Sequence, residues 1–160
     1  MKEPTYIQGN VTNPIGGGKR IVIHCCNNLF VMGSGVALAL LTKWPVVRSK
    51  YIEWGIKDNP HLGDVQFIKV EDGLVVGNMI GQHGIRTRNS IDQSPPIRYE
   101  AMDECLKKVA IVAKKHSASV HLPFKMGSDR AGGEWSKIEA LIRKNLCEQD
   151  IEVTIYEFNG

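Results

Sequence analysis

The stretch I-V-I-H-C-C-N-N-L-F-V-M-G-S-G-V-A-L-A-L-L, residues 21–41, decides the fold. Its first four residues, Ile21 to His24, form a short apolar and β-branched run, as expected of one buried strand. Asn27, Asn28 and a pair of glycines follow, and residues 36–41 are an apolar run of strong helix formers. A strand, a glycine-rich turn and a helix in this order direct backbone N–H groups at whatever lies above the turn. The stretch therefore predicts an anion site, most simply for a phosphate-bearing ligand such as a nucleotide.

The composition is that of an ordinary globular protein. The length of 160 residues predicts a single domain, residues 1–160, and the 42% hydrophobic and 23% charged residues argue against a largely disordered chain. The net charge is +3 and the pI is about 8.7. This falls short of the strongly basic character, a pI above about 9, of a dedicated nucleic-acid-binding domain. The charge is compatible with a small anionic ligand.

The N-terminus and the cysteines indicate a reduced, cytoplasmic protein. M-K-E-P-T-Y has no apolar signal segment, and no apolar run approaches the length of about 18 residues that a membrane span needs. The four cysteines lack the C-x₂-C spacing of a zinc site, and we expect neither a metal nor a cofactor. The pair Cys25-Cys26 is interpreted as structural thiols rather than as a redox pair or a nucleophile. A monomer is the default expectation.

The rest of the chain alternates between predicted strands and predicted helices. We expect strands at residues 6–8, 21–24, 65–70, 74–80, 120–123 and 153–156. We expect helices at residues 36–44, 46–54, 99–116 and 134–146, with Gly55 and the Asp58-Asn59-Pro60 cluster ending the second of them. Asp72-Gly73 predicts a hairpin between two of the strands. This order predicts a three-layer α/β/α sandwich with a mixed, mostly parallel central sheet.

Three segments are predicted loops. Residues 13–18 contain three glycines but no lysine–Ser/Thr pair that opens a helix, which favours a plain connector. Residues 81–96 are polar and basic, and a loop of this length is usually functional or mobile. Residues 124–133 form a second glycine-rich loop between a strand and a helix. In an α/β sheet, two such loops at the carboxyl ends of strands bracket one crevice.

Nearly the whole chain resembles a macrodomain, the ADP-ribose-binding fold. The motifs that match occur in the family's order: Gly9-Asn10-Val11-Thr12 for the opening G-D-I-T, residues 23–27 for the Asn-rich strand end, residues 33–37 for the G-x-G-[VI]-A loop, and residues 127–133 for the second phosphate loop. The resemblance is closest to the subgroup of terminal ADP-ribose glycohydrolases and yeast-type ADP-ribose 1″-phosphate phosphatases. The segments that carry this narrower match are 78–82, 95–99 and 131–135.

The resemblance implies a cleft for ADP-ribose or a derivative. Its ligand contacts, by position, are Gly9, Asn10, Val11, Asn27, Gly33, Ser34, Gly35, Val36, Gln82, Gly127, Ser128, Arg130, Ala131, Gly132, Gly133 and Tyr156. The glycines would let the diphosphate reach backbone donors, with close ligand approach favoured at Gly35 and Gly132. Asn27 is expected at the distal ribose.

The adenine end departs from the family pattern. Asn10 stands where the family usually has an aspartate that accepts a hydrogen bond from the exocyclic amine of adenine. We expect its amide oxygen to accept in the same way, without the assistance of a charge. Tyr156 or Phe158 either stacks on the base or is a core or edge aromatic residue, and the sequence leaves these alternatives open.

The catalytic end also departs from the family pattern. The terminal ADP-ribose glycohydrolases pair a lysine with an aspartate, and the corresponding positions fall at Gln82 and near Ala131. Glutamine cannot form a Schiff base, so we expect no lysine-dependent mechanism. Asp129 is a candidate for orienting or deprotonating a water, with Arg130 to compensate its charge. His24, or His83 in the long loop, is a second candidate, and a structural or solvent-facing role is the alternative for either histidine.

Three functional hypotheses follow. The first is an enzyme that removes the 1″-phosphate from ADP-ribose 1″-phosphate or detaches ADP-ribose from a protein or nucleic acid. The second is a non-catalytic ADP-ribose reader, which the missing lysine favours. The third is a macrodomain retuned for another nucleotide or for RNA, which Asn10 and the basic residues 81–98 leave open.

Overall fold

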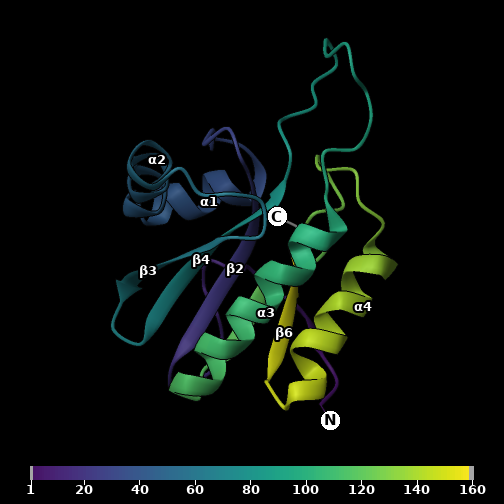
Figure 1. The fold of residues 1–160 in the computed structure, drawn as a ribbon. Coiled ribbons are helices and arrows are strands. Elements are labelled where there is room, and N and C mark those ends of the chain that lie inside the picture. The colour runs from purple at the N-terminus through teal and green to yellow at the C-terminus, as the bar shows by residue number, and fades with distance from the viewer. Residues whose placement is uncertain (1, 159–160) are drawn as a thin grey trace.

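A six-stranded sheet forms the centre of the protein, whose residues 2–158 are described by a computed structural model (Figure 1). The strand order is β1-β6-β5-β2-β4-β3. The strands are β1 (Thr5–Gln8), β2 (Arg20–Asn27), β3 (Val65–Glu71), β4 (Leu74–Gln82), β5 (Ser119–Pro123) and β6 (Val153–Glu157). Neighbouring strands are parallel except β3 and β4, which form the antiparallel hairpin predicted at Asp72-Gly73. The predicted mixed, mostly parallel sheet is confirmed.

Two layers of helices cover the sheet. The helices α3 (Tyr99–His116) and α4 (Trp135–Asn145) pack on one face, and α1 (Gly35–Lys43) and α2 (Val46–Asp58) pack on the other (Figure 1). A short 3₁₀ helix, Cys147–Gln149, follows α4. Each face has its own hydrophobic cluster, so the predicted three-layer sandwich is confirmed. No helix within residues 2–158 has the length and apolar character to cross a membrane.

The strand β2 lies inside the sheet, between β5 and β4. Ile21 and Ile23 point into the cluster under α3 and α4, while Val22 points into the cluster under α1 and α2. A strand buried on both faces must be apolar throughout, which explains the continuous run at its start. The pairing with β4 becomes irregular between Cys26 and Asn27, where the strand ends and the chain turns upward.

Helix α2 is longer than the sequence predicts. Gly55 lies within it, and the helix ends at Asp58, before Asn59 adopts a left-handed conformation at φ 44°. The ring of Phe30 covers Gly55 so closely that a Cβ at this position would lie 2.4 Å from a ring carbon. The glycine therefore admits an aromatic ring onto the helix and does not stop the helix.

Candidate functional site

Two adjoining cavities open at the carboxyl end of the parallel strands. The larger, about 1020 Å³, is bordered by the first loop (28–34), the long loop (83–98) and the second loop (124–133). The smaller, about 560 Å³, extends from the start of α1 to residues 10–11 and the end of β6. Residues of both cavities form the junction between them: Gly35, Val36, Pro123, Phe124, Lys125 and Asp129.

The N-terminus of α1 faces both cavities. Gly35 begins the helix at φ 59°, and a Cβ there would meet no atom within 4 Å. Gly33 is equally unobstructed, Ser34 makes no side-chain cap, and the first turn contains no acidic residue. Unpaired N–H groups and the helix dipole favour an anion at such an end. Gly33, Ser34, Gly35 and Val36 all line the larger cavity, and their contact with a phosphate stays a prediction.

Asn27 shapes the first loop from the end of β2. Its Oδ1 accepts hydrogen bonds from the N–H groups of Leu29 at 3.0 Å and Val31 at 3.3 Å, and its Nδ2 donates to the Val31 carbonyl at 2.8 Å. The hydroxyl of the buried Tyr51 donates to the Asn27 carbonyl. Asn27 lines the larger cavity, but the loop occupies both ends of its amide. Its contact with a distal ribose stays a prediction.

The glycines of the second loop mainly serve the packing of the loop itself. Gly132 adopts φ 73°, and a Cβ there would lie 2.9 Å from the guanidinium of Arg86. Gly133 donates its N–H to the Gly127 carbonyl at 2.9 Å, and a Cβ on Gly133 would lie 2.5 Å from that oxygen. Neither Gly132 nor Gly133 lines one of these two cavities, so the close ligand approach predicted at Gly132 and the contact predicted at Gly133 stay predictions. Gly127 does line the larger cavity.

Gly9 and Ser128, which the sequence predicts as ligand contacts, do not line either of these cavities. Gly9 closes the end of β1, where its N–H donates to the Glu157 carbonyl at 3.0 Å. The hydroxyl oxygen of Ser128 is buried and has no hydrogen-bond partner among the described residues. The Ser128 hydroxyl is thus turned into the protein, while Gly9 serves the pairing of β1 and β6.

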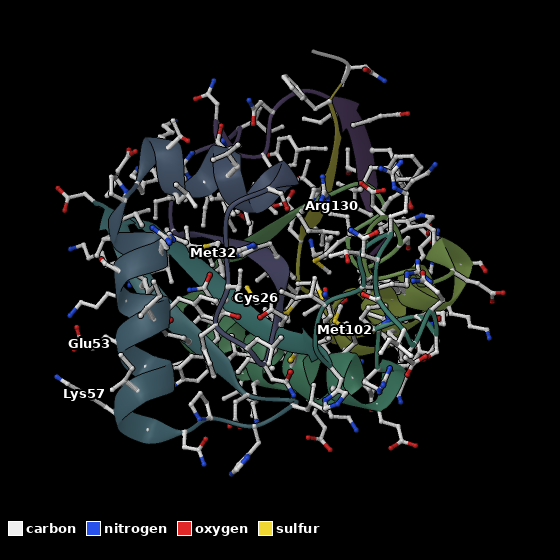
Figure 2. The ribbon with its side chains drawn as sticks, turned by 90° about the horizontal axis from the view of Figure 1, so that it is seen from above. Cys26, Met32, Glu53, Lys57, Met102 and Arg130 are labelled. Atoms are coloured by element: carbon white, nitrogen blue, oxygen red, sulfur yellow. The ribbon has the colours of Figure 1, made fainter. Side chains whose placement is uncertain are left out.

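Four cations line the larger cavity. Arg86 and Arg88 come from the long loop, and Lys125 and Arg130 come from the second loop. In the view down onto this end of the sheet, Arg130 lies across from Met32 and Cys26 (Figure 2). Asp129 is the single carboxylate lining the cavity among residues 2–158. This excess of positive charge favours an anionic ligand.

His24 borders the larger cavity but is turned into the layer of α1 and α2. Its side chain is 2% exposed, and its Nε2–H donates to Asn78 Oδ1 at 2.5 Å. Burial lowers the pKa of His24 from 6.5 to about 4, so the imidazole is neutral near pH 7. A general acid or base must reach the reacting group. This placement argues against the predicted catalytic role of His24 and favours the structural alternative.

Tyr156 and Phe158, the two candidates for stacking on a base, both line the smaller cavity but differ in exposure. Tyr156 is 2% exposed, its hydroxyl lies 2.6 Å from His121 Nδ1, and it accepts the Ile15 N–H at 2.9 Å. Its ring borders the cavity as part of the core, which favours the alternative of a core aromatic residue for Tyr156. Phe158 also lines the cavity and is 63% exposed. Phe158 is therefore the aromatic ring that is free to contact a ligand.

Asn10 and Val11 line the smaller cavity as well. The amide oxygen of Asn10 already accepts two hydrogen bonds from Thr12, one from its N–H at 2.9 Å and one from its hydroxyl at 2.7 Å. An amide oxygen has two lone pairs, and both are used. With both lone pairs in use, this oxygen has no free acceptor site for the amine of adenine in this conformation, and the contact of Asn10 with the base stays a prediction.

The long loop is fastened to the first loop next to the larger cavity. Asn28 Nδ2 lies 2.9 Å from His83 Nδ1, and Asn28 Oδ1 accepts the Gly84 N–H at 2.8 Å. Gln82, which lines the cavity, donates through Nε2 to the Gly84 carbonyl at 3.0 Å. These bonds hold the base of the long loop beside the cavity that Arg86 lines.

The thiols of Cys25 and Cys26 line the larger cavity. Burial raises the pKa of Cys25 to about 12, so its thiol, which borders the larger cavity, stays protonated near neutral pH. Within residues 2–158, no group of three or more His, Cys, Asp or Glu side chains is placed to hold a metal ion.

Most predicted contacts do line one of the two cavities. They are Asn10, Val11, Asn27, Gly33, Ser34, Gly35, Val36, Gln82, Gly127, Arg130, Ala131 and Tyr156, together with Asp129 and His24. Phe124 and Lys125, which follow β5 directly, line both cavities and are not among the predicted contacts. Their position just past a parallel strand, at the edge where such sheets bind ligands, was the available signal.

Known proteins place this chain in a family. No family model matches it. A solved structure of a protein of unknown function from Bacteroides thetaiotaomicron is 43% identical, with a TM-score of 0.92 over 98% of both chains. A macrodomain protein from Streptomyces coelicolor is 39% identical, with a TM-score of 0.83 over 96% of this chain and 98% of its own.

Longer proteins match over a part of their length. The mouse chromodomain-helicase-DNA-binding protein 1-like is 32% identical over 96% of this chain, which spans 17% of the mouse protein. The structure of Thermosipho africanus DarTG in complex with ADP-ribose is 20% identical, with a TM-score of 0.67 over 86% of this chain and 37% of its own, and shares the fold. Because the Streptomyces macrodomain protein is 39% identical over nearly its whole length, the chain belongs to the macrodomain family.

Proposed function

We propose that the two joined cavities bind ADP-ribose or a derivative of it. One observation carries the proposal: the two cavities meet at the open N-terminus of α1, where Gly35 and Lys125 belong to both. ADP-ribose consists of two ribose-bearing halves joined by a diphosphate, which matches two cavities joined at an anion site. Thermosipho africanus DarTG, part of which shares this fold, has been solved in complex with ADP-ribose.

The charges support the same ligand. Arg86, Arg88, Lys125 and Arg130 oppose the single carboxylate Asp129 at the larger cavity. Lys125 stands at the junction and is the cation best placed for the diphosphate. Phe158 and the apolar residues at the smaller cavity suit the base, while the polar and larger cavity suits the distal ribose and any group attached to it.

Calorimetry with ADP-ribose and with its two halves, AMP and ribose 5-phosphate, tests the proposal. We expect ADP-ribose to bind more tightly than either half, because only the whole molecule reaches both cavities. Replacing Lys125 by glutamine should weaken ADP-ribose binding about tenfold, the loss of one charged hydrogen bond. Lys50→Gln on α2, which lines neither cavity, is the matched control. No measurable binding of either ADP-ribose or its counterpart with hypoxanthine as the base would overturn the proposal.

A second candidate function is the processing of the bound ADP-ribose group. Asp129 favours it, because this carboxylate lines both cavities and is the one available to deprotonate a water at the larger cavity. Substrates to test are ADP-ribose 1″-phosphate, ADP-ribosylated protein and ADP-ribosylated nucleic acid. Asp129→Asn should reduce turnover at least about a hundredfold, since general-base catalysis contributes at least that much, while ADP-ribose binding is kept. Tight binding without turnover of any of these substrates would identify a reader instead.

A further inference from the structure

The smaller cavity has the character of a base-binding pocket. The apolar residues Val11, Val36 and Ala39 line it, together with the exposed Phe158. A planar base gains from stacking on such a ring and from leaving water in an apolar pocket. Polar groups in this pocket then decide which base is accepted.

The amide of Asn10 has a fixed orientation in this pocket. The Thr12 N–H lies 2.9 Å from the Asn10 Oδ1, and a backbone N–H can only donate, so the atom facing it must be the oxygen. The Thr12 hydroxyl, at 2.7 Å, takes the second lone pair of the same oxygen. Nδ2 has no acceptor within hydrogen-bond distance in residues 2–158, so it remains available as a donor toward a ligand.

An available donor selects against an amine and for a carbonyl. The exocyclic group of adenine is itself a donor, and two donors that face each other leave both unsatisfied. A carbonyl in the same position, as in hypoxanthine, accepts the hydrogen bond from Nδ2. We propose that Asn10 makes this macrodomain prefer a nucleotide diphosphate ribose whose base carries a ring carbonyl over ADP-ribose itself. The inference rests on the proposed function and specifies its ligand.

Apart from Asp129 at the junction, the described residues that line this pocket include one further acidic side chain, Glu157. Its carboxylate accepts a hydrogen bond from Gln8 Nε2 at 3.3 Å and has acceptor capacity left. If Glu157 rather than Asn10 met the edge of the base, an amine would be favoured. The two residues therefore predict opposite preferences.

Calorimetry with ADP-ribose and with inosine diphosphate ribose, its hypoxanthine counterpart, separates them. We expect the wild-type protein to bind the hypoxanthine nucleotide about five- to tenfold more tightly, the effect of one matched against one mismatched hydrogen bond. Asn10→Asp keeps the acceptor for Thr12 but replaces the donor by a second acceptor, so it should reverse the preference. Asn13→Asp adds the same charge in the same loop, lines neither cavity, and should keep the wild-type order.

Each outcome has a distinct meaning. A preference for the hypoxanthine nucleotide that Asn10→Asp reverses and Asn13→Asp leaves in place supports the inference. A preference of the wild-type protein for ADP-ribose that persists in Asn10→Asp overturns the inference alone and assigns the base to Glu157. Failure of both nucleotides to bind the wild-type protein overturns the proposed function and this inference together.

Discussion

His24 and His121 are buried on the neighbouring strands β2 and β5, each 2% exposed. His24 donates to Asn78, and His121 lies 2.6 Å from the hydroxyl of Tyr156. Burial lowers the pKa of both imidazoles from 6.5 to about 4, with the charge of Arg20 adding to the effect at His121. Both are thus neutral members of the core near pH 7, although histidine is often read as a catalytic residue.

These histidines should make the fold sensitive to mild acid. The unfolded chain takes up protons at both below pH 6.5 while the folded chain does so only near pH 4, so stability is full above pH 6.5 and falls toward pH 4. Between pH 7 and pH 4.5 we expect a loss of about 2 to 3 kcal/mol for each histidine. Urea unfolding at several pH values measures this. His121→Gln should flatten the profile, and a profile unaffected by His121→Gln would contradict the assignment.

The first loop and helix α2 form one packing unit at the scale of elements. Phe30 adopts φ 60° and lays its ring on Gly55, with Tyr51 at 5.1 Å and Trp54 at 6.4 Å between ring centroids. Residues 33–35 line the larger cavity, and the loop before them is therefore held in place by its contacts with α2. A contact between two segments about 25 residues apart sets the position of the anion site.

Gly55→Ala tests this unit. Alanine is the better helix former by about 1 kcal/mol, but its Cβ would lie 2.4 Å from the Phe30 ring. We expect a net destabilisation of about 1 to 3 kcal/mol, as for overpacked cores. In a Phe30→Ala background the clash is absent, so the same substitution should stabilise by about 0.5 to 1 kcal/mol. Urea unfolding of the four proteins gives the cycle, and an effect of the same sign in both backgrounds would contradict the contact.

At the scale of the whole molecule, the sheet gathers cations that are distant in the sequence. Arg86 and Arg88 arrive from the connection after β4, and Lys125 and Arg130 from the connection after β5. The chain as a whole carries only +3, so the positive field is concentrated at one end. Such a field attracts an anion over distances comparable to the Debye length, so dissolved salt screens the attraction.

ADP-ribose binding should therefore weaken as salt is added. Raising the ionic strength from 0.05 to 0.5 M should increase the Kd about three- to tenfold, because the Debye length shrinks from about 14 to about 4 Å. Lys125→Gln should show a smaller dependence on salt, since one of the interacting charges is gone. Calorimetry at the two salt concentrations measures both, and equal Kd values for the wild-type protein would argue against an electrostatic contribution of the cleft.

Much of the fold could be predicted, and the reasons lie in particular segments. Tyr99 to His116 repeats apolar residues at the helical period, and the helix α3 has those bounds. Asp72-Gly73 predicts the hairpin of β3 and β4, which is present. The prediction that α2 ends before Gly55 is wrong, because this glycine makes room for the ring of Phe30, which is distant in the sequence. Local patterns identify elements, and they do not show which distant group needs the space.

The sequence by itself determined the order of strands and helices, the buried central strand and the glycine-rich turn before α1, because these depend on periodicity and local backbone preference. The tertiary structure decided which polar groups remain available to a ligand. The imidazole of His24 is already hydrogen-bonded to Asn78, 54 residues away in the sequence. The hydroxyl of Tyr156 already accepts the N–H of Ile15, 141 residues away. Lys125, unremarkable in the sequence, stands at the junction of both cavities. A polar side chain serves a site only if no other group in the folded chain satisfies it first, and packing brings those groups together.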